Sequence, residues 1–96
     1  MIKVVAVNFL KEECVDEFLA ISKGLVEKTN ALDKGCIKYE LCRAANDPLK
    51  FAMLEEWEDQ ESLDAHMKAQ HFVENVPKFG NLTSKPSELM LLEKVY

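Results

Sequence analysis

The sequence predicts a single α+β domain whose strands and helices follow the order βαββαβ. Apolar residues recur at the two-residue period of a strand in four segments, and at the spacing of an amphipathic helix in two segments between them. With 96 residues, of which 48% are hydrophobic and 30% charged, the chain can build one core and leaves no room for a second. We therefore expect one domain over residues 1–96.

The first predicted strand covers residues 2–10 and is apolar on both of its alternating faces, so we expect it to be buried on both sides. Asn8 is its polar exception beyond Lys3. A buried amide needs hydrogen-bond partners, so Asn8 is either a structural bridge or part of a pocket wall. Residues 12–31 follow with apolar positions at helical spacing, which predicts an amphipathic helix packed against a sheet.

Two further strands, residues 36–43 and 50–58, predict an antiparallel hairpin. Turn-forming residues at 33–35 precede the hairpin, and the turn Asn46-Asp47-Pro48 connects its strands. Alternation places a carboxylate between large apolar side chains on one face of the second strand. The residues of that face are Phe51, Met53, Glu55 and Trp57.

Asp59 is expected to cap a short helix over residues 62–69, which carries His66 on the same side as Leu63 and Met67. That side should face the sheet. The helix therefore presents an imidazole to the space above Glu55 and Trp57.

The remainder of the chain completes the sheet. Residues 71–76 predict a further turn or two of helix, ended by Pro77 and Gly80, and residues 81–87 read as a loop. The last predicted strand, residues 88–96, is again apolar on both faces.

This element order fits a four-stranded antiparallel sheet with right-handed crossovers and both helices on one face, the ferredoxin-like arrangement. Two helices can cover only one face of a sheet. Because the first and last strands are apolar on both faces, we expect a second copy of the chain to cover the other face, which predicts a homodimer.

Composition excludes several classes of protein. Cys14, Cys36 and Cys42 are odd in number and lack C-x-x-C spacing, which argues against a disulfide framework and a zinc site. A net charge of −5 and the absence of a basic cluster argue against a nucleic-acid partner. No long apolar segment indicates export or membrane insertion, so we expect a cytoplasmic protein with no membrane contact.

The stretch from Glu55 to Phe72 resembles the antibiotic biosynthesis monooxygenase (ABM) domain family. The resemblance rests on Glu-x-Trp, a short acidic helix, and His-x-x-x-x-His-Phe, and extends to the strand after Gly35 and the turn at Asn46, covering nearly the whole chain. It implies a dimeric α+β barrel. Members that this pattern resembles include cofactor-free quinol and anthrone oxygenases, haem-degrading proteins and an isomerase of a phosphorylated sugar.

The sequence thus predicts a pocket between the sheet and its helices. His66 is its expected acid/base group, with Glu55 as assistant and Asn8 holding a substrate oxygen. A core histidine satisfied by Glu55 or by a backbone carbonyl is the structural alternative for His66. Trp57 is either core or a flat wall on which an aromatic ring stacks. The expected substrate-binding residues are Trp57, Tyr39, Leu63 and His71.

A metal centre of His66, His71 and Glu55 is the sharper hypothesis for the two histidines. Five positions apart on an unbroken helix, the two rings would point roughly 140° away from each other, so we expect no metal unless the helix breaks near Gln70. For His71 we favour a local anchor at a helix start, hydrogen-bonded nearby while Phe72 packs.

The leading functional hypothesis is a cofactor-independent monooxygenase that oxidises quinols or related phenolic compounds with molecular oxygen. Three glycines and no glycine-rich fingerprint leave nicotinamide and flavin cofactors without sequence support. A sugar-phosphate isomerase is the alternative enzyme, although its cations would be scattered. A haem-binding module is the non-enzymatic alternative, but Val76 stands where the resembling proteins have their haem-ligating histidine, so no tight His-ligated haem complex is expected.

Overall fold

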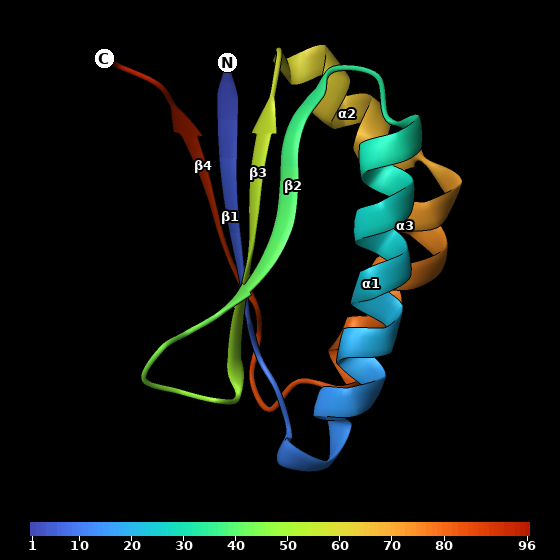
Figure 1. Ribbon diagram of the computed structural model, residues 1–96, viewed down its shortest axis with the longest axis vertical. Coiled ribbons are helices and arrows are strands. Elements are labelled where there is room, and N and C mark those ends of the chain that lie inside the picture. Colours follow the sequence, from blue (N-terminus) through green and yellow to red (C-terminus); the bar gives the residue numbers. More distant parts are fainter.

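The computed structural model describes residues 1–96 and has one four-stranded antiparallel sheet with every helix on the same face (Figure 1). The strands are β1 (Ile2–Phe9), β2 (Cys36–Arg43), β3 (Lys50–Trp57) and β4 (Glu88–Glu93), in the spatial order β2-β3-β1-β4. The helices are α1 (Val15–Leu32), α2 (Gln60–Lys68) and α3 (Gln70–Asn75), with 3-10 turns η1 (Glu12–Cys14) and η2 (Val76–Asn81). The predicted ferredoxin-like topology is confirmed.

The central strands of the sheet are β1 and β3, and their register decides which side chains face the helices. Val4 pairs with Glu55, and Asn8 pairs with Phe51. These four side chains are buried, whereas Val5 and Val7 on the other face are only half-buried in the single chain. The expectation that β1 is buried on both sides therefore holds for the helix-covered face alone.

Aromatic residues close the core at the end of the sheet where α1 begins. The Phe18 ring on α1 lies with its centroid 5.3 Å from that of Phe51 on β3 and 4.8 Å from that of Phe79 on η2. The amphipathic spacing of the long helix is largely confirmed, since Phe18, Leu25 and Thr29 are buried. Leu19 departs from it because it lies 37% exposed.

Two local predictions are wrong. Strand β2 has a register irregularity between Cys36 and Lys38, so Ile37 is 50% exposed and does not share the inward face with Tyr39. Pro77 does not end the helical segment, because it stands at the start of η2, where a proline ring already has a suitable φ and no hydrogen bond is lost. Helical structure therefore reaches Asn81, inside the predicted loop.

The outer face of the sheet is uncovered in the single chain. Strand β4 is exposed along its whole length, with Met90 at 56% and Leu92 at 40% exposure on this outer face. At one end of the face Lys3 and Lys38 lie 3.4 and 3.6 Å from the Glu56 carboxylate. None of the helices is long and apolar enough to cross a membrane.

Candidate active site

Strand β3 supplies two residues at the centre of the site, the carboxylate of Glu55 and the indole of Trp57. Its inward face alternates as predicted, with Glu55 7% exposed and Trp57 fully buried. The Trp57 Nε1–H donates to Glu55 Oε1 over 3.0 Å, and this is the carboxylate's only hydrogen bond within the protein. The pair satisfies the buried indole and fixes the orientation of the Glu55 carboxylate.

Helix α2 is held at its start by two interlocked contacts. Asp59 Oδ1 accepts from the Ser62 backbone N–H at 2.8 Å, the expected cap, and from the Ser62 hydroxyl at 2.7 Å. Gly35, at φ +84°, lies so close to Ser62 that any added Cβ would collide with its side chain. The turn that follows α1 therefore packs against the start of α2, and this places Asp33 next to that helix.

The helix breaks at Ala69, whose ψ of 147° is extended, and α3 restarts at Gln70. His66 and His71 therefore do not diverge as they would on one helix. Their ring centroids are 6.0 Å apart, and both rings are buried. The break that the sequence allowed near Gln70 is present, one residue earlier.

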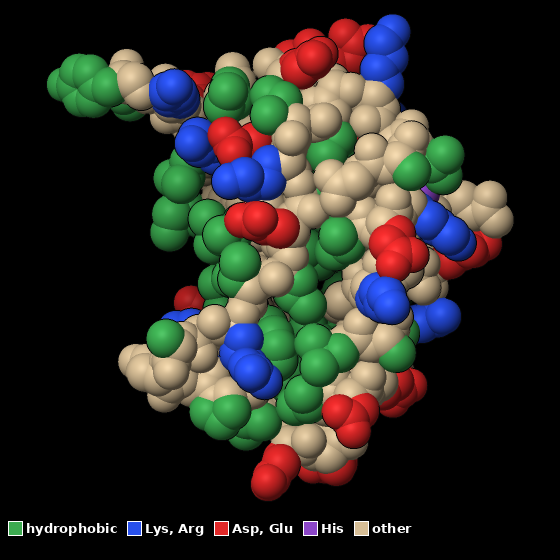
Figure 2. Space-filling model, viewed as in Figure 1, with side chains coloured by type: hydrophobic (Ala, Val, Ile, Leu, Met, Phe, Trp, Pro, Cys, Tyr) green, Lys and Arg blue, Asp and Glu red, His purple; other side chains and the backbone are tan.

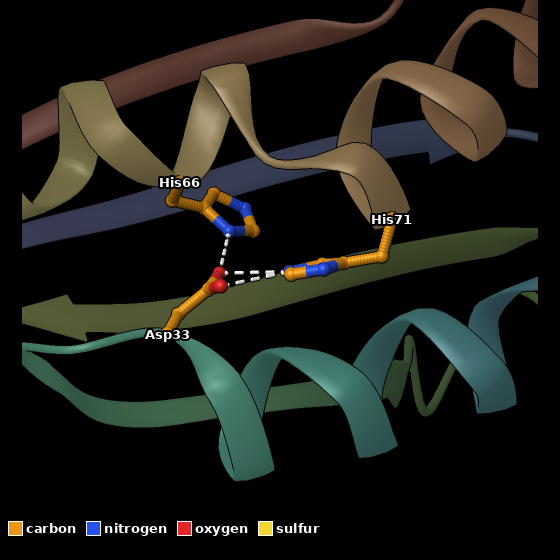
Figure 3. A group of neighbouring side chains, drawn as sticks. All are labelled: Asp33, His66 and His71. Carbon is orange, nitrogen blue, oxygen red and sulfur yellow. Dashed lines mark hydrogen bonds and ion pairs between the residues drawn. The ribbon is translucent and has the colours of Figure 1, made fainter.

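Asp33 lies between the two imidazoles (Figure 3). His66 Nδ1 is 2.5 Å from Asp33 Oδ2, and His71 Nε2 is 2.9 Å from each Asp33 oxygen. Side chains from the end of α1, the end of α2 and the start of α3 thus converge on one carboxylate. The hydrogen-bond partner of His66 is therefore Asp33 and not Glu55. His71 is not a locally bonded anchor either, because its own partner lies 38 positions away in the sequence.

The sequence analysis assigned no site role to Asp33, because Asp-Lys-Gly is a common turn sequence. The position of Asp33 at a helix end does, however, indicate that it needs a partner. Asp33 is the C-cap of the 18-residue helix α1, where the helix dipole disfavours a negative charge. An acid at that end is locally unfavourable, which is a reason to look for cationic or hydrogen-bond-donating partners elsewhere in the fold.

His66 lines a cavity and has one ring nitrogen without a partner in the protein. Since the Asp33 carboxylate takes the Nδ1 proton as a hydrogen bond, the neutral ring has an unprotonated Nε2. That Nε2 atom is buried and has no hydrogen-bond partner in the protein. Burial lowers the pKa of His66 below its usual value, and nearby His71 lowers it further against the opposing effect of Asp33. The ring is therefore held as a neutral base.

Glu55 is the second group with altered acidity. Burial raises its pKa from 4.5 to about 7, and the hydrogen bond from Trp57 opposes that rise. Burial also raises the pKa of the neighbouring Tyr39 phenol, with the Glu55 charge adding to the effect. Near neutral pH the site therefore offers a neutral phenol and a carboxyl group close to half protonation.

The cavity has a volume of about 390 Å³ and lies between the sheet and the helices. Figure 2 shows hydrophobic side chains gathered along the hollow between these two layers. Asn8 lines the cavity and accepts a hydrogen bond from the Ser87 hydroxyl over 2.5 Å. The sequence predicted either a structural bridge or part of a pocket wall at this position, and Asn8 is both. Four other residues that were predicted to line the pocket also line this cavity, namely Tyr39, Glu55, Leu63 and His66.

Two predicted pocket residues do not line the cavity. Trp57 lies behind His66, with ring centroids 4.6 Å apart, and has no exposed surface on which a substrate could stack. His71 turns toward Asp33 instead. Phe72 and Val76 line the cavity in addition. None of the residues that line it is a lysine or an arginine.

The fold and the site together define a ferredoxin-like α+β domain with a carboxylate-held histidine at the wall of an apolar cavity. Residues 1–77 match the model of the family described as antibiotic biosynthesis monooxygenase, and the chain belongs to this family.

Similar proteins agree with that assignment. Over 84 residues the chain is 31% identical to the protein named "Putative monooxygenase YcnE" from Bacillus subtilis, covering 88% of this chain and 87% of that one. A crystal structure of a conserved protein from Methanosarcina mazei is 38% identical, with a TM-score of 0.94 and coverage of 98% and 92% of the two chains. A crystal structure of an antibiotic biosynthesis monooxygenase is 34% identical, with a TM-score of 0.93 and full coverage of both.

Proposed function

We propose that this chain is a monooxygenase of quinols or related phenolic compounds, with His66 as the base that removes the substrate's hydroxyl proton. The observation that carries the proposal is the unpartnered, buried Nε2 of His66, a residue that lines the cavity and whose Nδ1 is tied to Asp33. A hydroxyl within hydrogen-bond reach of that nitrogen can pass its proton to it. The resulting imidazolium is stabilised by the Asp33 carboxylate.

The oxygen chemistry then follows from the substrate. The phenolate gives one electron to O₂, and the radical pair combines to form a carbon–oxygen bond at a ring carbon that bears hydrogen. Loss of that hydrogen as a proton, with cleavage of the O–O bond, leaves a new carbonyl and releases water. One oxygen atom enters the product and the other is reduced to water, so the substrate itself supplies the electrons.

The remaining polar groups of the cavity have positions that suit this substrate class. Asn8 can hold an oxygen substituent at the β1 wall, while the Tyr39 phenol and a protonated Glu55 can donate hydrogen bonds to developing negative charge. Most of the lining is apolar, and a volume of about 390 Å³ suits a molecule of one to a few rings.

The two alternatives have less support. A sugar phosphate needs cationic donors, and the cavity wall contains none. A haem-binding module would need an iron ligand at the cavity, yet Val76 occupies the expected position and His71 is turned toward Asp33.

The test is oxygen consumption with 1,4-naphthoquinols and benzoquinols, using ¹⁸O₂ and product mass analysis. We expect one labelled atom in a hydroxyquinone product and one in water. The matched control substrate is the corresponding dimethyl ether, which has no hydroxyl proton to remove and should be inert. Release of hydrogen peroxide with unlabelled quinone, at the rate without protein, would contradict the proposal.

We further propose that the working form is a homodimer. The outer face of the sheet has an apolar centre of half-buried and exposed side chains, and on β4 the outward-facing Met90 and Leu92 are 56% and 40% exposed in the single chain. A second copy packed against the outer face of the sheet would bury this apolar surface, which a monomer would leave in contact with water.

Sedimentation of the protein at micromolar concentration is expected to give a dimer. Met90→Glu should convert it to monomer, because the charge would be buried in the interface. Val73→Glu is the matched control, since Val73 lies 51% exposed on α3, on the helical side. A folded wild-type monomer, or a dimer that survives Met90→Glu, would contradict the assignment of this face.

A further inference from the structure

The cluster of Asp33, His66 and His71 has more ligand chemistry than a general base requires. Its three ligand atoms, one from each side chain, all lie within 4.8 Å of one another. The Asp33 and His71 side chains are 8% and 7% exposed, and His66 is 1% exposed. His71 neither lines the cavity nor contacts the space where the proposed reaction occurs. The proposed reaction therefore requires nothing of His71.

Two imidazole nitrogens and one carboxylate oxygen form a donor set suited to zinc. Zinc takes such ligands at about 2.0–2.2 Å in tetrahedral geometry, which places neighbouring ligand atoms roughly 3.3–3.5 Å apart. The nitrogen–oxygen contacts of 2.5 and 2.9 Å would need to open by less than about 1 Å to admit the ion. Calcium and magnesium are poor candidates because they prefer several oxygen ligands.

We propose that Asp33, His66 and His71 bind a zinc ion on the side of His66 that faces away from the cavity. The three residues come from the C-cap of α1, from α2 and from α3, so the ion would link the three α-helices that cover the sheet (Figure 3). A water molecule completes the tetrahedron from the small exposed surface of Asp33 and His71. The ion does not reach the cavity, so it has a structural or regulatory role.

Zinc binding has a consequence for the proposed reaction, and this step rests on the proposed function. Metal at Nδ1 forces the His66 proton onto Nε2, because a neutral imidazole carries one proton. No net proton is gained or lost, but Nε2 changes from a proton acceptor into a hydrogen-bond donor. Zinc therefore inhibits proton removal from a hydroxyl substrate, and a chelator restores it.

The binding test uses the untagged, metal-free protein and does not depend on activity. Titration with Co²⁺ is expected to give the visible absorption of a tetrahedral site at one ion per chain, and Zn²⁺ should displace it. His71→Gln and Asp33→Asn should each lower the affinity more than about 100-fold, because each removes one of three protein ligands. Cys36→Ser and Glu55→Gln are the controls and should bind as the wild type does, which separates this site from the Cys36 thiol and from the cavity carboxylate.

Nitrogen NMR of the His66 ring gives an independent readout. It uses the wild-type protein and so does not depend on whether a variant folds. The metal-free ring should carry its proton on Nδ1, and the zinc-loaded ring on Nε2. Absence of stoichiometric Co²⁺ or Zn²⁺ binding, or binding that survives His71→Gln and Asp33→Asn, would overturn the site. Zinc binding without any oxygenation by the metal-free protein would retain the site and reject the proposed function.

Discussion

Replacing His66 by glutamine is expected to lower kcat for quinol oxygenation by about 10²–10⁴-fold, the usual contribution of a positioned general base. Glutamine can still donate to the Asp33 carboxylate but has no basic nitrogen that could accept the substrate's proton. Asp33→Asn should cause a loss of similar size, because the uncharged amide neither holds the Nδ1–H tautomer nor stabilises the imidazolium. KM should change little in either variant, since both substitutions spare the apolar walls. Initial rates of oxygen uptake measure both effects.

The control for this prediction is Glu55→Gln, which removes a cavity carboxylate that has no hydrogen bond to His66. We expect its kcat to fall less than about tenfold. Thermal melting of each variant must accompany the kinetics, because His66 and Asp33 are nearly buried. If Asp33→Asn keeps full turnover while Glu55→Gln loses it, the assignment of Asp33 as the positioning residue is wrong and the sequence-based pairing of Glu55 with His66 is right.

The fold could be predicted because its determinants are local or periodic. The alternation of Phe51, Met53, Glu55 and Trp57 places these residues on one face whatever the rest of the chain does. The Asp59 cap fixes the start of α2 in the same local way. Departures occur where local periodicity is interrupted, as at Ile37, which lies at the register irregularity of β2 and is exposed.

The site was predictable only in part because it depends on contacts between distant segments. His66 is recognisable from helical spacing alone, but its partner lies 33 positions away in a turn. The approach of that turn depends on the Gly35 backbone lying against Ser62, which no short-range pattern reveals. For Trp57 the sequence left two roles open, core or stacking wall, and its neighbours bury it completely behind His66.

Glu55 should make the folded protein less stable as the pH rises from about 4.5 to above 7. Its pKa is raised from 4.5 to about 7 in the folded state, so in this range the folded protein binds more protons than the unfolded chain. The stabilising contribution of the protonated group is complete below pH 4.5 and is lost as the pH passes through about 7. At 1.36 kcal/mol per pKa unit, and allowing for cavity water, the free energy of unfolding should fall by about 2–3 kcal/mol from this group.

Glu55→Gln removes that titration while keeping the size of the side chain and an acceptor for the Trp57 indole. Urea unfolding from pH 5 to pH 8.5 is therefore expected to show a stability difference in favour of the variant that grows with pH, by about 2–3 kcal/mol across the range. Glu27→Gln is the matched control, because Glu27 is exposed on α1 and should shift stability by less than about 0.5 kcal/mol at every pH. A difference between Glu55→Gln and the wild type that stays constant with pH would mean that Glu55 is ionised in the folded protein throughout this range. Its carboxylate would then be a permanent negative charge at the cavity wall, and a hydrogen bond donated by Glu55 to the substrate could no longer be part of the reaction.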